Sequence, residues 1–211
     1  MVKMRIYGGI KFSRKVVFFR FIMVFLDLSF ISPRAVTSGE AGPDYPWNMD
    51  GEMGRVFVLL NGHRTGLSLP ERVRLSYVIV EEGRRYDFDP LFILALIETE
   101  STFYNWSRSN KGAMGLMQVL PGTGRMVAGE LNIPWDGDET LFNPFHNVRI
   151  GLRYFSTLLG MYKDDLDKAL AAYSSGPSYI EALAADGEGL PTRFSERVFS
   201  HYNDLRERIK T

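Results

Sequence analysis

The sequence has no cysteine among its 211 residues. This absence excludes disulfide bonds, thiolate metal sites and a cysteine nucleophile, although it leaves the redox compartment open. Histidine is scarce as well: His63, His146 and His201 are the only three, and none stands in an HExxH pattern or a similar spacing. We therefore expect no metal site, and we expect surface or capping roles for the three histidines.

The sequence also lacks a charge excess and a long uninterrupted apolar run. Lys plus Arg equals Asp plus Glu at 25 each, so no global charge favours nucleic acid as a partner. The apolar stretch Val16 to Ile31 is cut by Arg20 and Asp27, which makes it too short and too charged for a membrane span of about 20 residues. Residues 1–35 are predicted to be either an atypical signal peptide or a basic, apolar arm that is disordered or membrane-associated.

Two further regions follow along the chain. Residues 36–69 begin with a stretch rich in Gly, Pro, Ser and acidic residues and are predicted to be a linker or arm. From residue 70 the apolar spacing is helical, and no strand alternation stands out, so residues 70–211 are predicted to form an all-α domain of about six or seven helices. The first expected helix begins at residue 70 and ends at Glu81-Glu82-Gly83, and the second spans 90–101. A third begins at Pro121, and a fourth spans about 144–159. A fifth is capped by Asp165 or Asp167 and continues through Tyr173, and the last spans about 192–209.

Glu100 ends a segment that is apolar from Leu91 to Ile97 and that opens with Asp89-Pro90, a helix cap followed by proline at the first helical position. A helix that is apolar on every side is normally buried. A carboxyl group where such a helix reaches the surface is partly desolvated, which raises its pKa and favours the proton-donating form. From spacing alone, a general acid and an ordinary helix residue both fit Glu100. Glu98 points about 200° away on the helix, so it is expected to be solvated or salt-bridged and not to pair with Glu100.

Two other segments hold candidate binding residues. In the loop from Lys111 to Thr123, Gly112 and Gly115 permit tight turns, and Gln118 offers both a hydrogen-bond donor and an acceptor. A helix of small residues, 169–175, ends at Gly-Pro. Tyr173 near its end either bonds a neighbouring carboxyl group or packs as an ordinary core tyrosine.

Taken together, these segments carry four motifs in order. They are Glu100-Ser101-x-Phe103; Ser109-x-x-Gly112-Ala113-x-Gly115-Leu116-Met117-Gln118-x-x-Pro121-x-Thr123; Asn143-Pro144-x-x-Asn147-x-x-x-Gly151-x-x-Tyr154; and Ala171-Ala172-Tyr173-x-x-Gly176-Pro177. From about residue 72 to 206, the chain resembles the lytic transglycosylase catalytic domain of the soluble-lytic-transglycosylase type, which has a lysozyme-like fold.

The resemblance implies an enzyme that cleaves the β-1,4 bond between N-acetylmuramic acid and N-acetylglucosamine in peptidoglycan, without water and without a cofactor. Glu100 would be the single catalytic acid/base, and the product would be a 1,6-anhydromuramoyl end. The residues implied in substrate binding or in support of Glu100 are Ser101, backbone groups at Gly115, Leu116 and Met117, Gln118, Tyr173 and Ser174. At Ser174 the family usually has asparagine, so a contact with the substrate is expected to be weaker there.

Two alternatives share the fold. A hydrolytic muramidase would use water as the acceptor, held by a second carboxylate such as Asp136 or Asp138. A non-catalytic peptidoglycan-binding or assembly module would have no need of a desolvated acid. The resemblance also implies a place in the periplasm or cell envelope, with peptidoglycan strands as the partner and a secretion or appendage apparatus as a further candidate.

Overall fold

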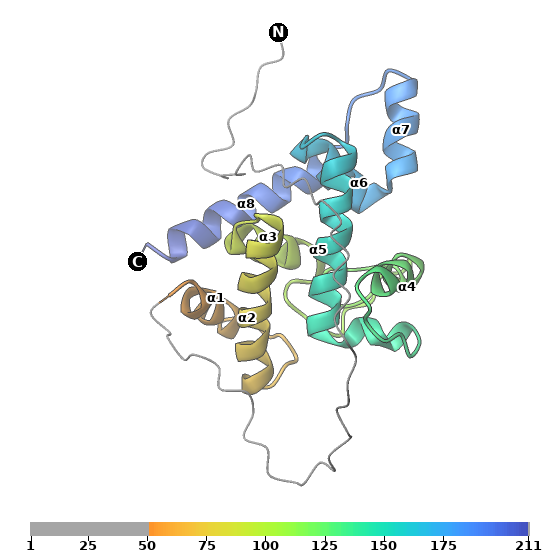
Figure 1. Cartoon of the computed structure of the whole chain (residues 1–211). Helices are drawn as coiled ribbons and strands as arrows, with labels where there is room; N and C mark the ends of the chain where they lie inside the picture. Colours follow the sequence, from red (N-terminus) through yellow and green to blue (C-terminus); the bar gives the residue numbers. More distant parts are fainter. Residues whose placement is uncertain (1–50, 211) are drawn as a thin grey trace, which may run out of the picture.

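The computed structural model describes residues 51–210, which form eight α-helices and one short 3-10 helix (Figure 1). The helices are α1 (Glu52–Asn61), α2 (Leu69–Tyr86), α3 (Pro90–Ser101), α4 (Pro121–Glu130), η1 (Asp138–Phe142), α5 (Pro144–Met161), α6 (Leu166–Ser175), α7 (Pro177–Ala185) and α8 (Arg193–Arg208). The predicted all-α class is confirmed. The segment 1–35, predicted as a signal peptide or arm, lies outside the described residues.

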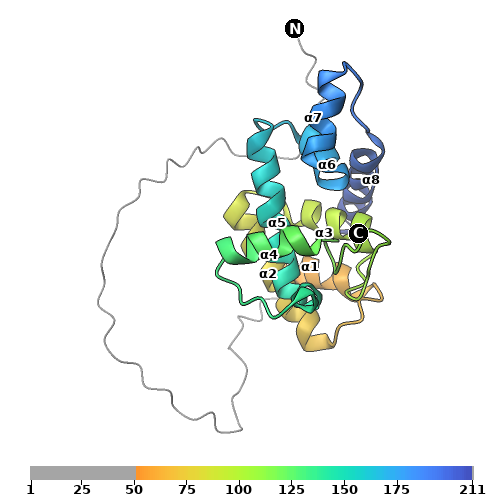
Figure 2. The same cartoon turned by 90° about the vertical axis from the view of Figure 1, so that its right-hand side faces the viewer.

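Helix α3 lies in the middle of the bundle in both views (Figures 1 and 2), and its most extensive helix contact is with α8. The predicted bounds 90–101 are confirmed, and all residues from Pro90 to Ile97 are buried. Asp89 fixes the start of α3, because its side chain accepts a hydrogen bond from the Leu91 amide at 2.9 Å and another from the Tyr202 hydroxyl of α8 at 2.7 Å. The helix ends at Thr102, which has a left-handed backbone conformation.

Helix α1 corrects the sequence prediction, because it lies within the region predicted to be a linker or arm. Val56 and Leu60 of α1 are 1% and 0% exposed, and the helix packs against α2. The prediction was wrong for residues 52–61. Their apolar residues recur at helical spacing and bury one face of α1 against the core.

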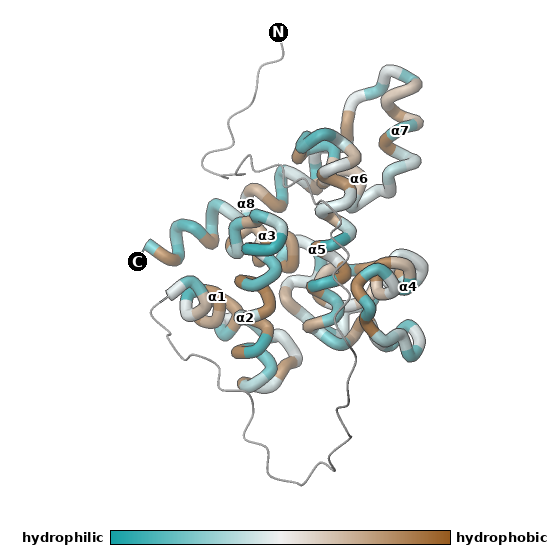
Figure 3. The backbone as a smooth tube through the Cα atoms, viewed as in Figure 1, coloured by the Kyte–Doolittle hydropathy of each residue, from teal (hydrophilic) through white to brown (hydrophobic). Residues whose placement is uncertain are grey.

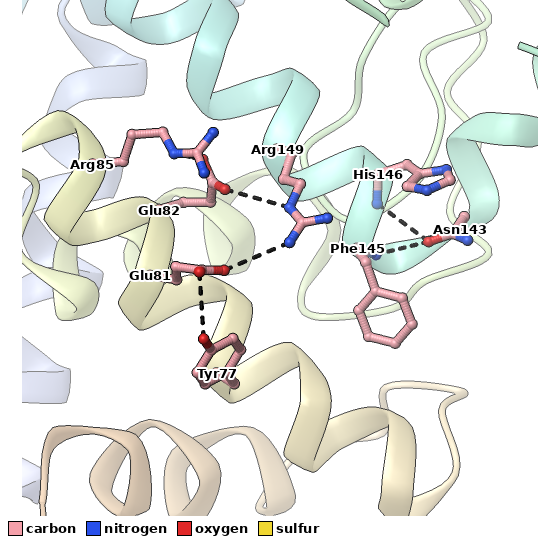
Figure 4. Close-up of polar contacts among 8 residues, drawn as sticks. All are labelled: Tyr77, Glu81, Glu82, Arg85, Asn143, Phe145, His146 and Arg149. Atoms are coloured by element: carbon pink, nitrogen blue, oxygen red, sulfur yellow. Dashed lines mark hydrogen bonds and ion pairs between the residues drawn. The ribbon is translucent and has the colours of Figure 1, made fainter. Parts of the chain in front are cut away.

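A network of charged side chains joins α2 to α5, close to the point where α2 was predicted to end (Figure 4). Glu82 is buried, and its carboxylate pairs with Arg149 of α5 at 3.3 Å and with Arg85 at 3.5 Å. Arg149 also reaches Glu81 at 3.6 Å. Burial raises the pKa of Glu82, and the two arginines oppose this rise. The helix does not end at Glu81-Glu82-Gly83 as predicted: α2 continues to Tyr86, and Asp87 caps it with a left-handed backbone conformation. Gly83 lies inside the helix, where a Cβ would collide with the Phe88 carbonyl group.

The other helix ends agree in part with prediction. Proline opens α4 as expected, and Asp165 rather than Asp167 caps α6, where its carboxylate accepts from the Lys168 amide at 3.1 Å. Helix α7 was missed, because Gly176-Pro177 was interpreted as a stop although proline is equally suited to the first position of a new helix. Hydrophilic and hydrophobic residues alternate along α2 and α8 (Figure 3). None of the described helices has the length and apolarity needed to cross a membrane.

Candidate active site

Glu100 lies in the last turn of α3 and is partly buried. Burial raises the pKa of its carboxyl group to about 8, and the Arg197 guanidinium on α8 opposes this rise. Within residues 51–210 the Glu100 side chain makes no hydrogen bond and no ion pair. With that pKa, about nine in ten molecules hold a neutral, protonated carboxyl group at pH 7. Glu100 is therefore available to give a proton to a ligand.

Glu98 faces the other side of α3, as its spacing predicts. Its carboxylate lies 3.4 Å from Nδ1 of His201 on α8, and its side chain is 14% exposed. Because Glu98 points toward α8 at a different place, it does not form an acid pair with Glu100. The role of Glu100 as the single acid of this helix end stays a prediction.

The loop from Thr102 to Leu120 is held in shape by Asn147, a fully buried residue of α5. Its amide nitrogen donates to the carbonyl groups of Met114 and Leu141, both at 2.9 Å, and its Oδ1 accepts from the Met117 amide at 2.8 Å. Gly115 has a φ of 79°, and a Cβ there would collide with the Asn147 side chain and the Leu141 carbonyl group. The loop therefore requires both a glycine and an asparagine 32 positions apart in the sequence.

Gln118 lines a cavity of about 150 Å³ between this loop and α6. Its Nε2 donates to the carbonyl groups of Ser107 at 3.1 Å and Gly115 at 2.9 Å. The side-chain oxygen has no partner within the described residues and can accept a hydrogen bond from a ligand. The residues that line this cavity are Lys111, Gln118, Val119, Leu120, Thr123, Tyr154, Tyr173, Ser174, Ser175 and Gly176.

Tyr173 stands in the wall of the same cavity, next to Glu100. Its hydroxyl donates to the Met117 carbonyl group at 2.8 Å. The partner is thus a main-chain oxygen and not a neighbouring carboxyl group, which was one of the two alternatives from the sequence. Burial raises its pKa well above the ordinary value, and the negative charge of Glu100 adds to this rise. Tyr173 therefore ties α6 to the loop beside the acid.

A second cavity, of about 310 Å³, adjoins the first, because Ser174 and Ser175 line both. Its other lining residues are Pro191, Arg193, Phe194 and Arg197. Tyr173 lines the first cavity and Arg197 the second, and both interact with the charge of Glu100. Glu100 itself lines neither cavity, and it is linked to them through these two residues. Among the described residues, no Asp or Glu lines either cavity.

The predicted binding residues fall into two groups. Gln118, Tyr173 and Ser174 line the cavity. Leu116 and Met117 are 0% exposed, Gly115 is buried, and the Ser101 hydroxyl donates to the Ile97 carbonyl group at 3.1 Å. The second group is buried and does not line the cavity, and its predicted contacts with the substrate stay predictions.

Two residues near Glu100 were not assigned a role from the sequence. Tyr154 stands in the third motif, and its ring lies 5.7 Å from that of Tyr173. Arg197 donates from Nη2 to the Thr99 carbonyl group at 3.0 Å. The motif could have indicated Tyr154, whereas no local pattern marks Arg197, which reaches the site only because α8 packs along α3.

A larger cavity, of about 580 Å³, lies elsewhere, between the start of α3 and the end of α8. Charged residues of both signs line it, among them Arg55, Asp87, Asp89 and Arg206, and it is at the opposite end of α3 from Glu100. No group of three or more metal-binding side chains occurs within residues 51–210.

The fold belongs to the lysozyme-like all-α class, as two solved structures show. A structure of an inactive mutant of the lytic transglycosylase Slt from Pseudomonas aeruginosa aligns with a TM-score of 0.56 and 24% identity, over 64% of this chain and 24% of that one. The 70 kDa soluble lytic transglycosylase of Escherichia coli aligns with a TM-score of 0.50 and 22% identity, over 62% and 24%. Residues 77–188 match the Transglycosylase SLT domain model, and the chain belongs to this family.

Curated relatives agree with this membership. The putative soluble lytic murein transglycosylase of Haemophilus influenzae is 32% identical over 89 residues, which is 42% of this chain and 15% of that protein. The soluble lytic murein transglycosylase of Salmonella typhimurium is 29% identical over 124 residues, 57% and 19%. The membrane-bound lytic murein transglycosylase C of Klebsiella pneumoniae is 32% identical over 121 residues, 52% and 33%. The chain thus spans at most about a third of the length of these relatives.

Proposed function

We propose that the protein is a peptidoglycan lytic transglycosylase, with Glu100 as its single general acid/base. The observation that carries the proposal is the carboxyl group of Glu100, which is desolvated, has a pKa of about 8 and interacts electrostatically with Tyr173 and Arg197, two residues that line adjoining cavities. The family and the names of its relatives supply the substrate class, peptidoglycan glycan strands.

In the first step Glu100 protonates the glycosidic oxygen between N-acetylmuramic acid and N-acetylglucosamine as the bond from C1 to that oxygen breaks. A pKa near 8 keeps the acid loaded at neutral pH. The positive charge that develops at C1 is stabilised by the 2-acetamido group of the muramoyl residue, as in substrate-assisted glycosidases. Arg197 stabilises the Glu100 carboxylate that remains.

In the second step the Glu100 carboxylate takes the proton of the muramoyl O6 hydroxyl while O6 forms its bond to C1. This step closes the 1,6-anhydro ring and returns Glu100 to its protonated form, so no water is consumed. The raised pKa makes the carboxylate a better base than an ordinary glutamate.

The two rival functions fit the site less well. A muramidase needs a second carboxylate to hold water, but Glu98, the other acid near the end of α3, pairs with His201 of α8 instead. Asp136 lies in the segment that joins α4 to η1, Asp138 is the first residue of η1, and both are exposed. A pure binding module gains nothing from an acid whose burial costs stability.

Digestion of purified sacculi followed by mass spectrometry of the muropeptides tests the proposal. The wild-type protein should release products lighter by one water than reducing ends, and Glu100→Gln should abolish them while the protein stays folded by circular dichroism. Reducing ends would show a muramidase, and activity that survives in Glu100→Gln would refute the role of this acid.

The setting follows from the proposed substrate. Relatives are named as soluble and as membrane-bound murein transglycosylases, and peptidoglycan lies outside the cytoplasmic membrane, which supports a place in the periplasm or cell envelope. Association with a secretion or appendage apparatus stays a prediction from the sequence.

A further inference from the structure

The second cavity differs from the first in charge. Arg193 and Arg197 line it from the first two turns of α8, together with Pro191, Phe194 and the exposed Ser174 and Ser175. Its volume of about 310 Å³ lies at the lower end of the range for ligand pockets, about 300–1,000 Å³. The mechanism proposed for Glu100 uses the charge of Arg197 but gives Arg193 no role.

Most N–H donors of the Arg193 and Arg197 guanidinium groups have no acceptor within the described residues. Within residues 51–210 the Arg193 side chain makes no hydrogen bond and no ion pair. The Arg197 side chain donates one hydrogen bond, from Nη2 to the Thr99 carbonyl group. The nearby acid on α8, Glu196, accepts instead from the Thr192 hydroxyl at 2.8 Å. Each arginine carries five N–H donors in a planar fork that matches a carboxylate. The cavity is therefore prepared for an anionic group.

We propose that this cavity binds a carboxylate of the acidic peptide stem carried by the muramoyl residue, with Arg193 as the principal contact. The proposal rests on the proposed function. Each muramoyl residue bears its peptide on the lactyl group beside the sugar ring, so a strand placed with its scissile bond at Glu100 brings a stem close to that acid. Arg197 joins the two places, because it lines the cavity and also acts on the charge of Glu100.

Pro191 and Phe194 add an apolar surface to the cavity, which bears on selectivity. They give the cavity an apolar wall beside the arginines, which suits the aliphatic part of a peptide side chain whose carboxylate meets Arg193. The shared serines, Ser174 and Ser175, make the cavity continuous with the space lined by Gln118 and Tyr173. One ligand can thus occupy both, with its sugars in the first cavity and its stem in the second.

The test compares three forms of one substrate with the full chain: native glycan strands, strands stripped of stems by an amidase, and strands whose stem carboxylates are converted to amides with carbodiimide and ammonia. Arg193→Gln should lower kcat/KM on native strands about tenfold, the size expected for a lost charge-assisted hydrogen bond. On stripped or amidated strands it should match the wild-type protein. Arg84→Gln, which alters an exposed arginine on α2, is the matched control and should match wild type on all three.

An equal loss for Arg193→Gln on all three substrates would overturn the proposal, and so would no loss on native strands. A titration of the isolated stem peptide followed by NMR checks the cavity independently of activity. Saturable binding that disappears in Arg193→Gln supports the proposal, and a failure to bind contradicts it. If the wild-type protein forms no anhydro ends on any strand, the proposed function fails, and the peptide titration reports separately on the cavity.

Discussion

Replacing Glu100 with glutamine should make the protein more stable, and the gain should grow as the pH rises. The folded-state pKa is about 8, above the ordinary value of 4.5, so the folded protein holds the Glu100 proton more tightly than the unfolded chain does. The stabilising contribution of the bound proton is complete below pH 4.5 and is lost as the pH rises through about 8. Glutamine is neutral at every pH and avoids this loss.

The magnitude follows from the two pKa values. A difference of about 3.5 corresponds to at most about 5 kcal/mol, since one pKa unit is worth about 1.36 kcal/mol. Linkage then gives a gain in unfolding free energy of about 1 kcal/mol at pH 5, about 3 kcal/mol at pH 7 and about 5 kcal/mol at pH 9. The gain in the variant equals the stability that the wild-type protein loses by keeping an ionisable Glu100 at this buried position, as is common for functional residues.

Urea unfolding followed by circular dichroism at these three pH values measures the difference. The control is Glu188→Gln, which changes an exposed carboxyl group in the segment between α7 and α8 and should give no gain that grows with pH. A gain for Glu100→Gln that is equal at pH 5 and pH 9 would refute the reasoning, because it would show that the carboxyl group is not desolvated in the folded state.

Two further predictions concern the neighbours of Glu100. Arg197→Gln should move the alkaline limit of activity to higher pH, because the guanidinium lowers the pKa of Glu100, whereas Arg197→Lys should keep the limit near its wild-type place; a pH profile of kcat for both variants distinguishes a charge effect from a packing effect. Asn147→Ala should lower the unfolding free energy by about 3 kcal/mol or more, since it leaves the Met117 amide and the Leu141 carbonyl group unpaired in the interior and removes one of the two hydrogen bonds to the Met114 carbonyl group. An unchanged urea midpoint would contradict the second prediction.

The sequence predicted α3 most accurately, and the reason is local. Asp89 and Pro90 define its start through side-chain and ring chemistry, and the apolar run leaves burial as the only stable outcome. The raised pKa of Glu100 followed from the same two facts. By contrast, the glycine at which α2 was predicted to end, Gly83, stays inside the helix because the chain returns close to it at Phe88, a contact that the local pattern does not encode.

The cavities could be predicted only in part. Gln118 and Tyr173 stand in motifs whose composition suggests binding, and both line the first cavity. Arg193 and Arg197 belong to an amphipathic helix with many charged residues, and nothing in their spacing separates them from solvated neighbours. Their place beside Glu100 arises from the packing of α8 along α3, a tertiary contact that no local pattern encodes.

The dependence of the 102–120 loop on Asn147 has a consequence for protein engineering. The loop has almost no regular secondary structure, so it has no means of keeping its shape when it is moved to another scaffold. A chimera that exchanges this loop with that of a relative should keep its geometry only if the first turns of α5 are exchanged with it. The transferable unit is thus the 102–120 loop together with the start of α5, which begins more than 20 residues after the loop ends.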